Sequence, residues 1–459
     1  MATAIIVGGG IGGIASALLL RRSYQRVLLV ERAPRLGGLL QTAREQDGLA
    51  YDFGTHFAAT TGIADLDDLL FDFVSGDEWH EFDYLKAGNY FAGGLNENGA
   101  FIDASCLQRD VYLEGLEKLL DAMPGEEEPT DLHQQLVETY GSVYAEHIFE
   151  PVLRKLFGVD SRHLAPEAHV LFGMKRVMVA SAEASRELKR SPLYDQRIAF
   201  HNAYEGVNPA RVFYPRAGGI GRWVEGLTAK LRKAGVEILT GRSVEHVDHS
   251  NGRVRSLALD DGQSFECDRL IWTVPPFLLA KAAEIEVPSC PPRLRHTSLF
   301  HFVFDRPFST DLHYFYVYDP RHSVFRVTLY PNIGGQENAA GKYHCTAEVL
   351  SDGTRPLAEL TEQAREDLYA MGVVPADAHC HAVGQDLPPS GFPVLTGDFV
   401  KASRAQSREI ASRFDNLHLL GKASGASFFM NDVLREAYLT LSEACDDLDE
   451  TPSALSGAA

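Results

Sequence analysis

The chain has 459 residues, of which 45% are hydrophobic and 23% are charged, which is an ordinary globular composition and enough length for two or three domains. Its formal net charge of −20 excludes nucleic acid and anionic membranes as main partners, because both would repel it on average. A local basic pocket for a small anionic substrate is compatible with this charge.

Targeting and redox features favour a cytoplasmic protein. The apolar residues near the N-terminus follow no basic segment, so we expect no signal peptide there, and no other apolar run approaches the roughly 20 residues of a transmembrane helix. The cysteines form no C-x-x-C pair, which predicts reduced and mostly structural thiols. The six are Cys106, Cys267, Cys290, Cys345, Cys380 and Cys445.

Residues 4–18 predict a buried strand, a glycine turn and a helix rich in Ala and Leu. Gly8, Gly10 and Gly13 have the G-x-G-x-x-G spacing of a dinucleotide-binding turn, which brings backbone and helix start close to a pyrophosphate. The next apolar strand ends in Glu31, at close to the roughly 20-residue separation of an acid that binds the ribose. The whole unit predicts a bound dinucleotide; a turn that merely needs glycine is the alternative.

The segment after this strand carries a more specific pattern, Arg35-x-Gly37-Gly38 followed by Thr42. It resembles the FAD-dependent amine oxidase superfamily, which includes monoamine oxidases, protoporphyrinogen oxidase, phytoene desaturases and, more distantly, UDP-galactopyranose mutase. The resemblance implies FAD with this glycine pair against its ribityl and pyrophosphate part. A surface turn is the alternative. No cysteine lies in a recognised attachment motif, so we expect the FAD to be non-covalent.

Later segments extend the resemblance. Gly54-Thr55-His56 is similar to the segment that approaches the isoalloxazine ring in some members, and a structural histidine is the alternative. Residues 214–221 and 268–276 resemble the family's Pro-x-x-Gly-Gly turn and Thr-x-Pro strand. Val244 matches the valine whose backbone lies against adenine.

The C-terminal segment, residues 416–437, resembles the family's closing motif, in which a helix start stabilises the flavin pyrimidine. This chain has Gly421-Lys422 where the family commonly has Gly-Arg or Gly-Asp. The cofactor-binding residues implied by all these segments are Gly8, Gly10, Ile11, Gly12, Gly13, Glu31, Arg32, Arg35, Gly37, Gly38, Leu39, Gly54, Thr55, His56, Val244, Gly421, Asp432 and Val433.

Residues 290–385 contain aromatic-rich runs of strand length, which predict a sheet at the floor of a substrate cavity. Arg326 and Tyr330 are four residues apart in such a run, so we expect both on one sheet face, suited to an anionic or aromatic ligand. A solvent-facing strand pair is the alternative. With His56 they are the catalytic candidates. His379-Cys380-His381 is not expected to bind a metal, because neighbours in a strand point to opposite faces.

The region between these segments is mostly helical in pattern over residues 107–200, after an expected hairpin of residues 89–91 with 100–102. Residues 147–158 resemble a helix of the superfamily's substrate domain. Three basic residues of this region are either cations on the substrate side or ordinary surface charges. Two lie in this helix, Arg154 and Lys155, and the third is Arg176.

The expected fold class is α/β: a discontinuous, glutathione-reductase-like Rossmann FAD-binding domain with an inserted α+β substrate domain of helices and an antiparallel sheet. The FAD-binding domain comprises residues 1–85, 205–285 and 386–450. Residues 86–204 form the mainly helical part of the substrate domain, residues 286–385 its sheet-rich part, and residues 451–459 a tail.

Three functions are compatible with these features. The leading one is an FAD-dependent oxidoreductase, of the oxidase, dehydrogenase or desaturase type, in which hydride passes from a small organic substrate to flavin N5. The second is a redox-neutral sugar-nucleotide mutase similar to UDP-galactopyranose mutase. The third is a non-catalytic flavin-binding protein. Oligomeric state is left open.

Overall fold

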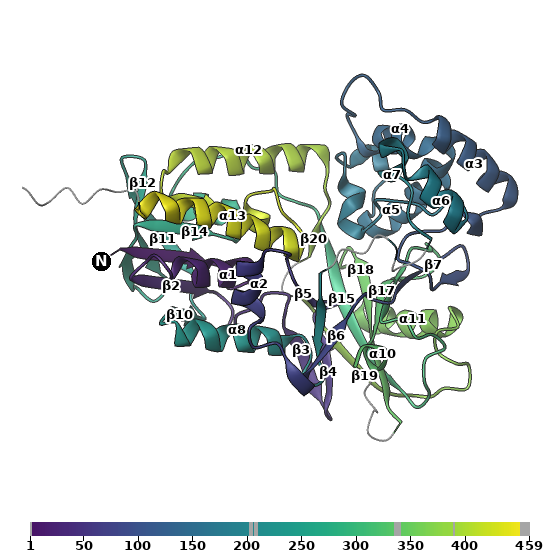
Figure 1. Ribbon diagram of the computed structural model, residues 1–459, viewed down its shortest axis with the longest axis horizontal. Helices are drawn as coiled ribbons and strands as arrows, with labels where there is room; N and C mark the ends of the chain where they lie inside the picture. The colour runs from purple at the N-terminus through teal and green to yellow at the C-terminus, as the bar shows by residue number, and fades with distance from the viewer. Residues whose placement is uncertain (1, 202–204, 206–209, 335–340, 389–390, 450–459) are drawn as a thin grey trace, which may run out of the picture.

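The computed structural model describes residues 2–201, 205, 210–334, 341–388 and 391–449. Its first sheet is parallel throughout (Figure 1), and its order from edge to edge is β10 (Glu237–Thr240), β2 (Arg26–Glu31), β1 (Thr3–Val7), β14 (Arg269–Trp272) and β21 (Leu417–Leu419). The strands β1 and β2 are almost entirely buried, which is the pattern of a parallel sheet covered on both faces. This arrangement confirms the Rossmann-type fold.

Alternate residues of these strands pack against two layers. Ile6 and Leu29 contact the layer formed by α1 (Ile11–Leu20), α8 (Gly221–Lys233) and α13 (Met430–Asp449). Ile5 and Leu28 contact the opposite layer. That layer combines a small antiparallel sheet with two helices: β11 (Val244–Ser250), β12 (Arg253–Leu259), β13 (Ser264–Glu266), α9 (Pro276–Ala282) and α12 (Gly397–Arg413).

The second large sheet is antiparallel except for one parallel pair, β16 with β7. Its main order is β19 (Cys380–Asp386), β15 (Leu294–Phe304), β18 (Tyr343–Ser351), β17 (Val324–Leu329), β16 (Tyr314–Val317), β7 (Ala87–Phe91) and β8 (Gly94–Asn96), with β20 (Phe392–Pro393) beside β15. The aromatic-rich strands expected in residues 290–385 are confirmed.

The two faces of this sheet differ in character. Phe302, Val327 and Ala347 belong to the apolar core that α11 (Leu357–Ala370) covers. The residues that alternate with them, Arg326 and Glu348 among them, face the other way, toward the segment after β4 (Leu49–Asp52). The polar face of the second sheet therefore meets the cofactor-binding half of the chain.

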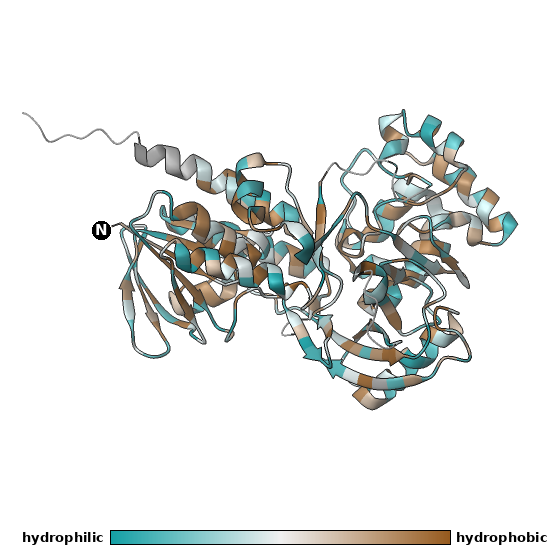
Figure 2. Cartoon of the chain, turned by 60° about the horizontal axis from the view of Figure 1, so that its bottom comes forward, coloured by the Kyte–Doolittle hydropathy of each residue, from teal (hydrophilic) through white to brown (hydrophobic). Residues whose placement is uncertain are grey.

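The helical part packs against one end of this sheet, around the turn between β16 and β17 (Figure 1). Its core is aromatic and aliphatic, with Tyr140, Phe149 and Phe157 all at most 2% exposed. Figure 2 shows hydrophobic residues concentrated in the interior strands, while the outer helices alternate between hydrophobic and hydrophilic residues. The helices are α3 (Arg109–Asp121), α4 (Leu132–Tyr144), α5 (Glu150–Phe157), α6 (Ala182–Leu188) and α7 (Pro192–Asp195).

Short elements connect these parts, and one differs from expectation. The hairpin partner of β7 is β8, so the expected pairing of residues 89–91 with 100–102 is wrong. Ala92 and Gly93 make the tight turn with φ of 50° and 84°. The connecting elements are β3 (Thr42–Gln46), β5 (Ala58–Ala59), α2 (Ala64–Phe71), β6 (Trp79–Phe82), β9 (Val212–Pro215) and α10 (Tyr330–Gly334).

The expected domain limits stay a prediction, although β7 and β8 join the sheet of residues 294–386 rather than the helices that follow them. The expected tail, residues 451–459, lies outside the described residues. Within the described ranges, no helix is long and apolar enough to cross a membrane.

Candidate functional site

The turn between β1 and α1 has the geometry that its glycines require. Gly8 has φ +106°, and a Cβ there would lie 2.2 Å from Thr273 Oγ1. A Cβ on Gly13 would lie 1.8 Å from the Gly8 carbonyl oxygen, so only glycine lets α1 approach the strand this closely. Gly10 differs, because a Cβ there would meet nothing within 4 Å. The turn is packed on both sides and open over Gly10.

Two further glycine segments converge on this turn. Gly37 donates its N–H to the Gly9 carbonyl at 2.7 Å, and a Cβ on Gly38 would lie 3.6 Å from Gly10 Cα. Val433, at the start of α13, lies close to both Gly12 and Gly421, because a Cβ on either would meet its Cγ1 at 2.8 or 3.2 Å. Segments far apart in the chain thus form one cradle.

Glu31 closes the cradle at the end of β2. Its carboxylate accepts hydrogen bonds from Gly9 N at 2.6 Å and from Ala33 N at 2.7 Å. It therefore shapes the turn even without a ligand. Arg32 is exposed beside it and Leu39 is half-buried.

Val244 and Arg35 lie further from the centre of the cradle. Val244 begins β11 and packs with the layer on the other face of the sheet. Arg35 lines a cavity that is bounded by α8 and β10. The predicted cofactor roles of these two residues stay predictions.

A dinucleotide cofactor fits this cradle. Backbone N–H groups of Ile11, Gly12 and Gly13 stand at the helix start, where the first helical bond is Ile14 N to Gly10 O. At the start of α13, Asn431 Oδ1 is buried without a hydrogen-bond partner among the described residues. Open space over Gly10 and an unsatisfied acceptor at a second helix start fit a bound dinucleotide, which would fill the first and could donate to the second.

His56 lies where the cofactor half meets the polar face of the second sheet. A Cβ on Gly54 would lie 2.9 Å from Glu348 Oε2 and 3.0 Å from Arg326 Nη2, so the turn before His56 sits directly on this ion pair. Thr55 N donates to Glu348 Oε1 at 3.3 Å, and Thr55 Oγ1 lies 2.5 Å from Thr328 Oγ1. The structure thus brings together His56 and Arg326, two of the three catalytic candidates.

Arg326 and Glu348 form a bidentate ion pair, with Nε–Oε1 of 2.5 Å and Nη2–Oε2 of 2.8 Å. The pKa of His56 is lowered to about 4, first by burial and then by the Arg326 charge. His56 is therefore a neutral imidazole at neutral pH. Sequence reasoning missed Glu348, because no motif surrounds it and only the register of β17 with β18 places it opposite Arg326.

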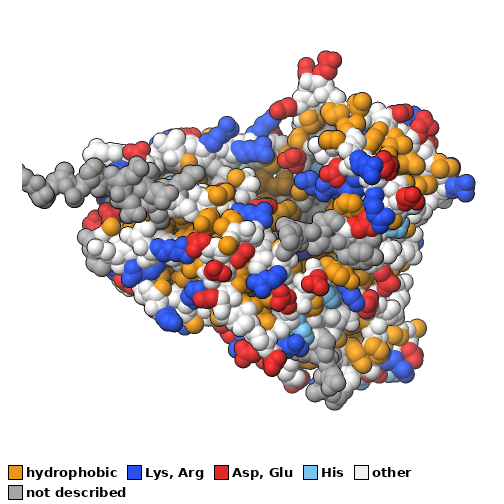
Figure 3. Space-filling model, in the orientation of Figure 1, with side chains coloured by type: hydrophobic (Ala, Val, Ile, Leu, Met, Phe, Trp, Pro, Cys, Tyr) orange, Lys and Arg blue, Asp and Glu red, His pale blue; other side chains and the backbone are white. Residues whose placement is uncertain are grey.

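Lys422 adds a second cation near His56, whose pKa its charge also lowers. Its side chain is accessible, its pKa is lowered by burial among protein atoms, and no described acidic group pairs with it. Its Nζ lies 4.9 Å from the ring centroid of Phe428. A side chain that is exposed to solvent and yet largely surrounded by protein atoms, as that of Lys422 is, is typical of the wall of a hollow. Figure 3 shows a hollow between the part with α12 and α13 and the part with α5 and α7, with hydrophobic side chains inside and both basic and acidic side chains at its rim.

Tyr330, the third catalytic candidate, shares the face of Arg326 as expected, although β17 ends at Leu329 and Tyr330 begins α10. It is 5% exposed, and its hydroxyl accepts from Asp52 N at 2.9 Å and lies 3.0 Å from Thr346 Oγ1. Thr346 in turn lies 2.9 Å from His301 Nδ1. This buried chain holds the strand that leads into the His56 turn, so Tyr330 supports the site from behind.

Asp52, at the end of β4, ties the cofactor segments together. It is 1% exposed and accepts from Tyr214 Oη at 2.6 Å, Ile220 N at 3.0 Å and Thr42 Oγ1 at 3.1 Å. Burial raises its pKa to about 7 despite these donors. The carboxyl thus joins the segment after the second glycine pair to the start of α8. Its motif position next to Gly54 is the signal that could have found it.

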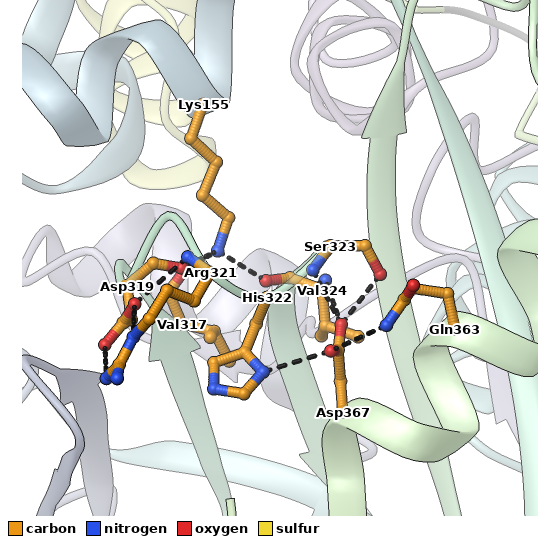
Figure 4. Close-up of polar contacts among 9 residues, drawn as sticks. All are labelled: Lys155, Val317, Asp319, Arg321, His322, Ser323, Val324, Gln363 and Asp367. Atoms are coloured by element: carbon orange, nitrogen blue, oxygen red, sulfur yellow. Dashed lines mark hydrogen bonds and ion pairs between the residues drawn. The ribbon is translucent and has the colours of Figure 1, made fainter. Parts of the chain in front are cut away.

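Lys155 is neither a substrate-side cation nor a surface charge (Figure 4). Its Nζ donates to the carbonyl oxygens of Val317 at 2.5 Å, Val324 at 2.7 Å and Asp319 at 2.9 Å. All three N–H bonds of the ammonium are therefore used to join α5 to the β16–β17 turn. The same turn is held from α11 by Asp367, which accepts from Ser323 N at 2.6 Å.

The other two basic candidates have ordinary structural roles. Arg154 is exposed and pairs with Glu150 at 2.7 Å, one helical turn away. Arg176 donates to the Asp195 carbonyl at 2.8 Å. In the part of the chain that the structure describes, no three His, Cys, Asp or Glu side chains are arranged to hold a metal ion.

A family model described as "Flavin containing amine oxidoreductase" matches residues 11–319. The chain belongs to this family. Its residues are 25% identical to all-trans-retinol 13,14-reductase of Rattus norvegicus over 57% of this chain and 44% of that protein. They are 24% identical to protoporphyrinogen oxidase of Bos taurus over 62% of each chain. The chain therefore matches 44% and 62% of the length of these two relatives.

Solved structures extend the likeness to the whole fold. Reduced UDP-galactopyranose mutase superposes with a TM-score of 0.75 at 16% identity, over 99% of this chain and 96% of that one. At this identity the likeness shows the fold. The family membership confirms the resemblance to the amine oxidase superfamily.

Proposed function

We propose that this protein is an FAD-dependent oxidoreductase that binds its cofactor non-covalently. The observation that carries the proposal is the convergence of the three glycine segments, with open space over Gly10, together with the half-buried His56 beside the Arg326–Glu348 ion pair. When bound, FAD would accept a hydride from a small organic substrate and pass the electrons to a separate acceptor.

The chain's own residues supply binding and orientation. The helix start at Ile11 would bind the pyrophosphate, and Glu31 would share its carboxylate with the adenosine ribose. His56 is neutral and its Nδ1 donates to the Gly54 carbonyl at 3.3 Å, so its Nε2 can accept one hydrogen bond at the substrate without carrying charge. Arg326 is neutralised by Glu348 and therefore orients groups beside it rather than attracting anions.

The substrate that suits this site is anionic or aromatic. Lys422 is the cation of the site that no described acid neutralises, and Arg326 lies 5.9 Å from the ring centroid of Tyr316. A protonated amine would be repelled by Lys422 and would find the Glu348 carboxylate already paired. The proposed activity is therefore on an acid or a neutral aromatic compound rather than on a cationic amine.

The cofactor-binding residues proposed here fall in residues 1–85, 205–285 and 386–450, which we propose as one discontinuous domain. The inserted residues 86–204 and 286–385 would form the substrate side.

A redox-neutral reaction on a sugar nucleotide is the second candidate. Lys422 suits a diphosphate, and the overall likeness to the mutase fold favours the comparison. Dithionite separates the two: a mutase turns over only after prior reduction and consumes no oxygen, whereas an oxidase reduces its flavin with substrate alone.

Photoreduction tests whether the protein is catalytic at all. We expect the flavin of the purified protein to be reduced by light and an electron donor and to be reoxidised when oxygen or an artificial acceptor is added. A flavin that cannot be reduced would instead indicate a structural cofactor.

A further inference from the structure

A second cavity lies behind the loop that carries the Arg35-x-Gly37-Gly38 pattern. Its volume is about 390 Å³, within the roughly 300–1,000 Å³ of small-molecule sites. It is bounded by the loop, by α8 and by the edge strand β10, and Gly10, Gly12 and Gly38 are not among its walls. It is therefore distinct from the cradle described above.

The cavity has an apolar floor. Leu36 and Val224 are both 4% exposed and Val236 is 6% exposed, and all three side chains belong to the core cluster beneath the sheet. Such a floor favours a ligand with a compact apolar body, because that body would leave water on binding.

Unpartnered polar groups converge above this floor. Arg35 and Arg232 both line the cavity and are exposed, and neither guanidinium group makes a hydrogen bond or an ion pair with any described residue. The Gln41 amide and the Thr240 hydroxyl line it as well, and among the described residues they too have no hydrogen-bond partner. Small-molecule sites typically combine an apolar lining with a few polar groups that orient the ligand, as this cavity does.

Three neighbouring arginines, by contrast, are paired with acidic residues. Arg26 pairs with Glu237 at 2.8 Å, Arg242 with Asp261 at 2.6 Å and Arg222 with Glu225 at 3.0 Å. The last contact also neutralises Glu225, the acidic residue of the cavity wall. In a chain with 63 acidic and 43 basic residues, two unpaired guanidinium groups at one cavity leave it locally positive.

We propose that this cavity binds a small organic anion, a carboxylate or a phosphate ester with a compact apolar body. Arg35 and Arg232 would hold the anionic group, since a planar guanidinium suits carboxylate and phosphate oxygens. Leu36, Val224 and Val236 would cover the apolar body. The occupant would contact the loop on the side opposite Gly38, so it does not compete with a cofactor in the cradle.

Calorimetric titration of the purified protein tests the proposal, with phenyl phosphate and benzoate as anionic probes and benzyl alcohol as the neutral match. We expect one or both anions to bind more tightly than the alcohol, and their relative affinity distinguishes a phosphate-ester site from a carboxylate site. Arg232→Gln should weaken binding by roughly tenfold or more, the loss of one charge-assisted hydrogen bond. Lys233→Gln, the adjacent exposed lysine outside the cavity, should bind as the wild type does.

A second variant protects the test against misfolding. Thr228→Trp fills the cavity from α8 and should abolish binding while circular dichroism and flavin content stay unchanged. Anion binding that survives both Arg232→Gln and Thr228→Trp, or that is no tighter than binding of benzyl alcohol, would overturn the proposal. Loss of the benzoate-induced change of the flavin spectrum in Arg232→Gln would also overturn it, because that change reports binding beside Lys422 and not in this cavity. The titration does not depend on flavin chemistry. The anion site can therefore be refuted while the proposed function holds, and the proposed function can be refuted while the anion site holds.

Discussion

The wild type should lose stability as pH rises because of Asp52, at the centre of the cofactor-binding half, and the substitution Asp52→Asn should abolish this loss. The Asp52 carboxyl is 1% exposed and accepts three hydrogen bonds, but no described Lys or Arg pairs with it. Burial raises its pKa to about 7, compared with about 3.9 in an unfolded chain. Asparagine keeps an oxygen acceptor of the same size and never carries a charge.

The direction in which stability changes with pH follows from the protons that Asp52 binds in the folded and unfolded states. A carboxyl whose pKa is raised on folding binds more protons in the folded state, so its stabilisation is complete below the unfolded pKa and is lost as pH rises through about 7. A shift of about 3 units corresponds to about 4 kcal/mol, of which about 3 kcal/mol is lost between about pH 5 and pH 8. For 459 residues, about 2.1 cal/mol/K of unfolding entropy per residue makes each kcal/mol worth about 1 °C.

Differential scanning calorimetry of both proteins between pH 5 and pH 8 measures this difference. We expect the Tm of the wild type to fall by about 3 °C relative to that of Asp52→Asn over this range. The exposed Asp68→Asn variant serves as the surface control and should follow the wild type. Parallel Tm curves for Asp52→Asn and the wild type would refute the raised pKa and the burial argument behind it.

Three further changes test other contacts. Lys155→Met leaves three buried carbonyls without their donor and should lower stability by about 2–4 kcal/mol in calorimetry. Lys118→Met, at a half-exposed lysine, should change stability little, and an equal effect of the two substitutions would contradict the bridging role. Lys422→Met should weaken the benzoate-induced change of the flavin spectrum by roughly tenfold and spare any effect of benzylamine; unchanged benzoate binding would remove the anion-binding role. His56→Ala, at normal flavin content, should slow flavin reduction by a substrate by about 100-fold, and full turnover would exclude a catalytic role.

The features that local sequence determines were predictable. The strand, turn and helix around Gly8–Gly13 follow from an apolar run, glycine spacing and an Ala-rich segment, all within a few residues. The same holds for Arg326 and Tyr330 on one face, because alternation along a strand needs no tertiary information.

The contacts that depend on register or on distant segments were not predictable. Glu348 meets Arg326 only because β17 and β18 pair in that register, and Lys155 is buried only because α5 packs on a turn more than 160 residues later. The hairpin at β7 was mispredicted for a local reason. Its two turn residues are Ala92 and Gly93, and an alanine at positive φ lacks the usual Asn-Gly or Asp-Gly signal.

The central claim is that the glycine cradle holds FAD, and Gly10→Ala tests it most directly. Gly10 has φ −71° and free space around its Cβ position, so alanine is compatible with the fold, and a cofactor pyrophosphate is what the added methyl group would meet. We predict a flavin absorption band in the purified wild type, or after addition of FAD, and a loss of that band in Gly10→Ala at unchanged circular dichroism. Absence of flavin from the wild type after FAD is added, or equal FAD affinity in both proteins, would contradict the account.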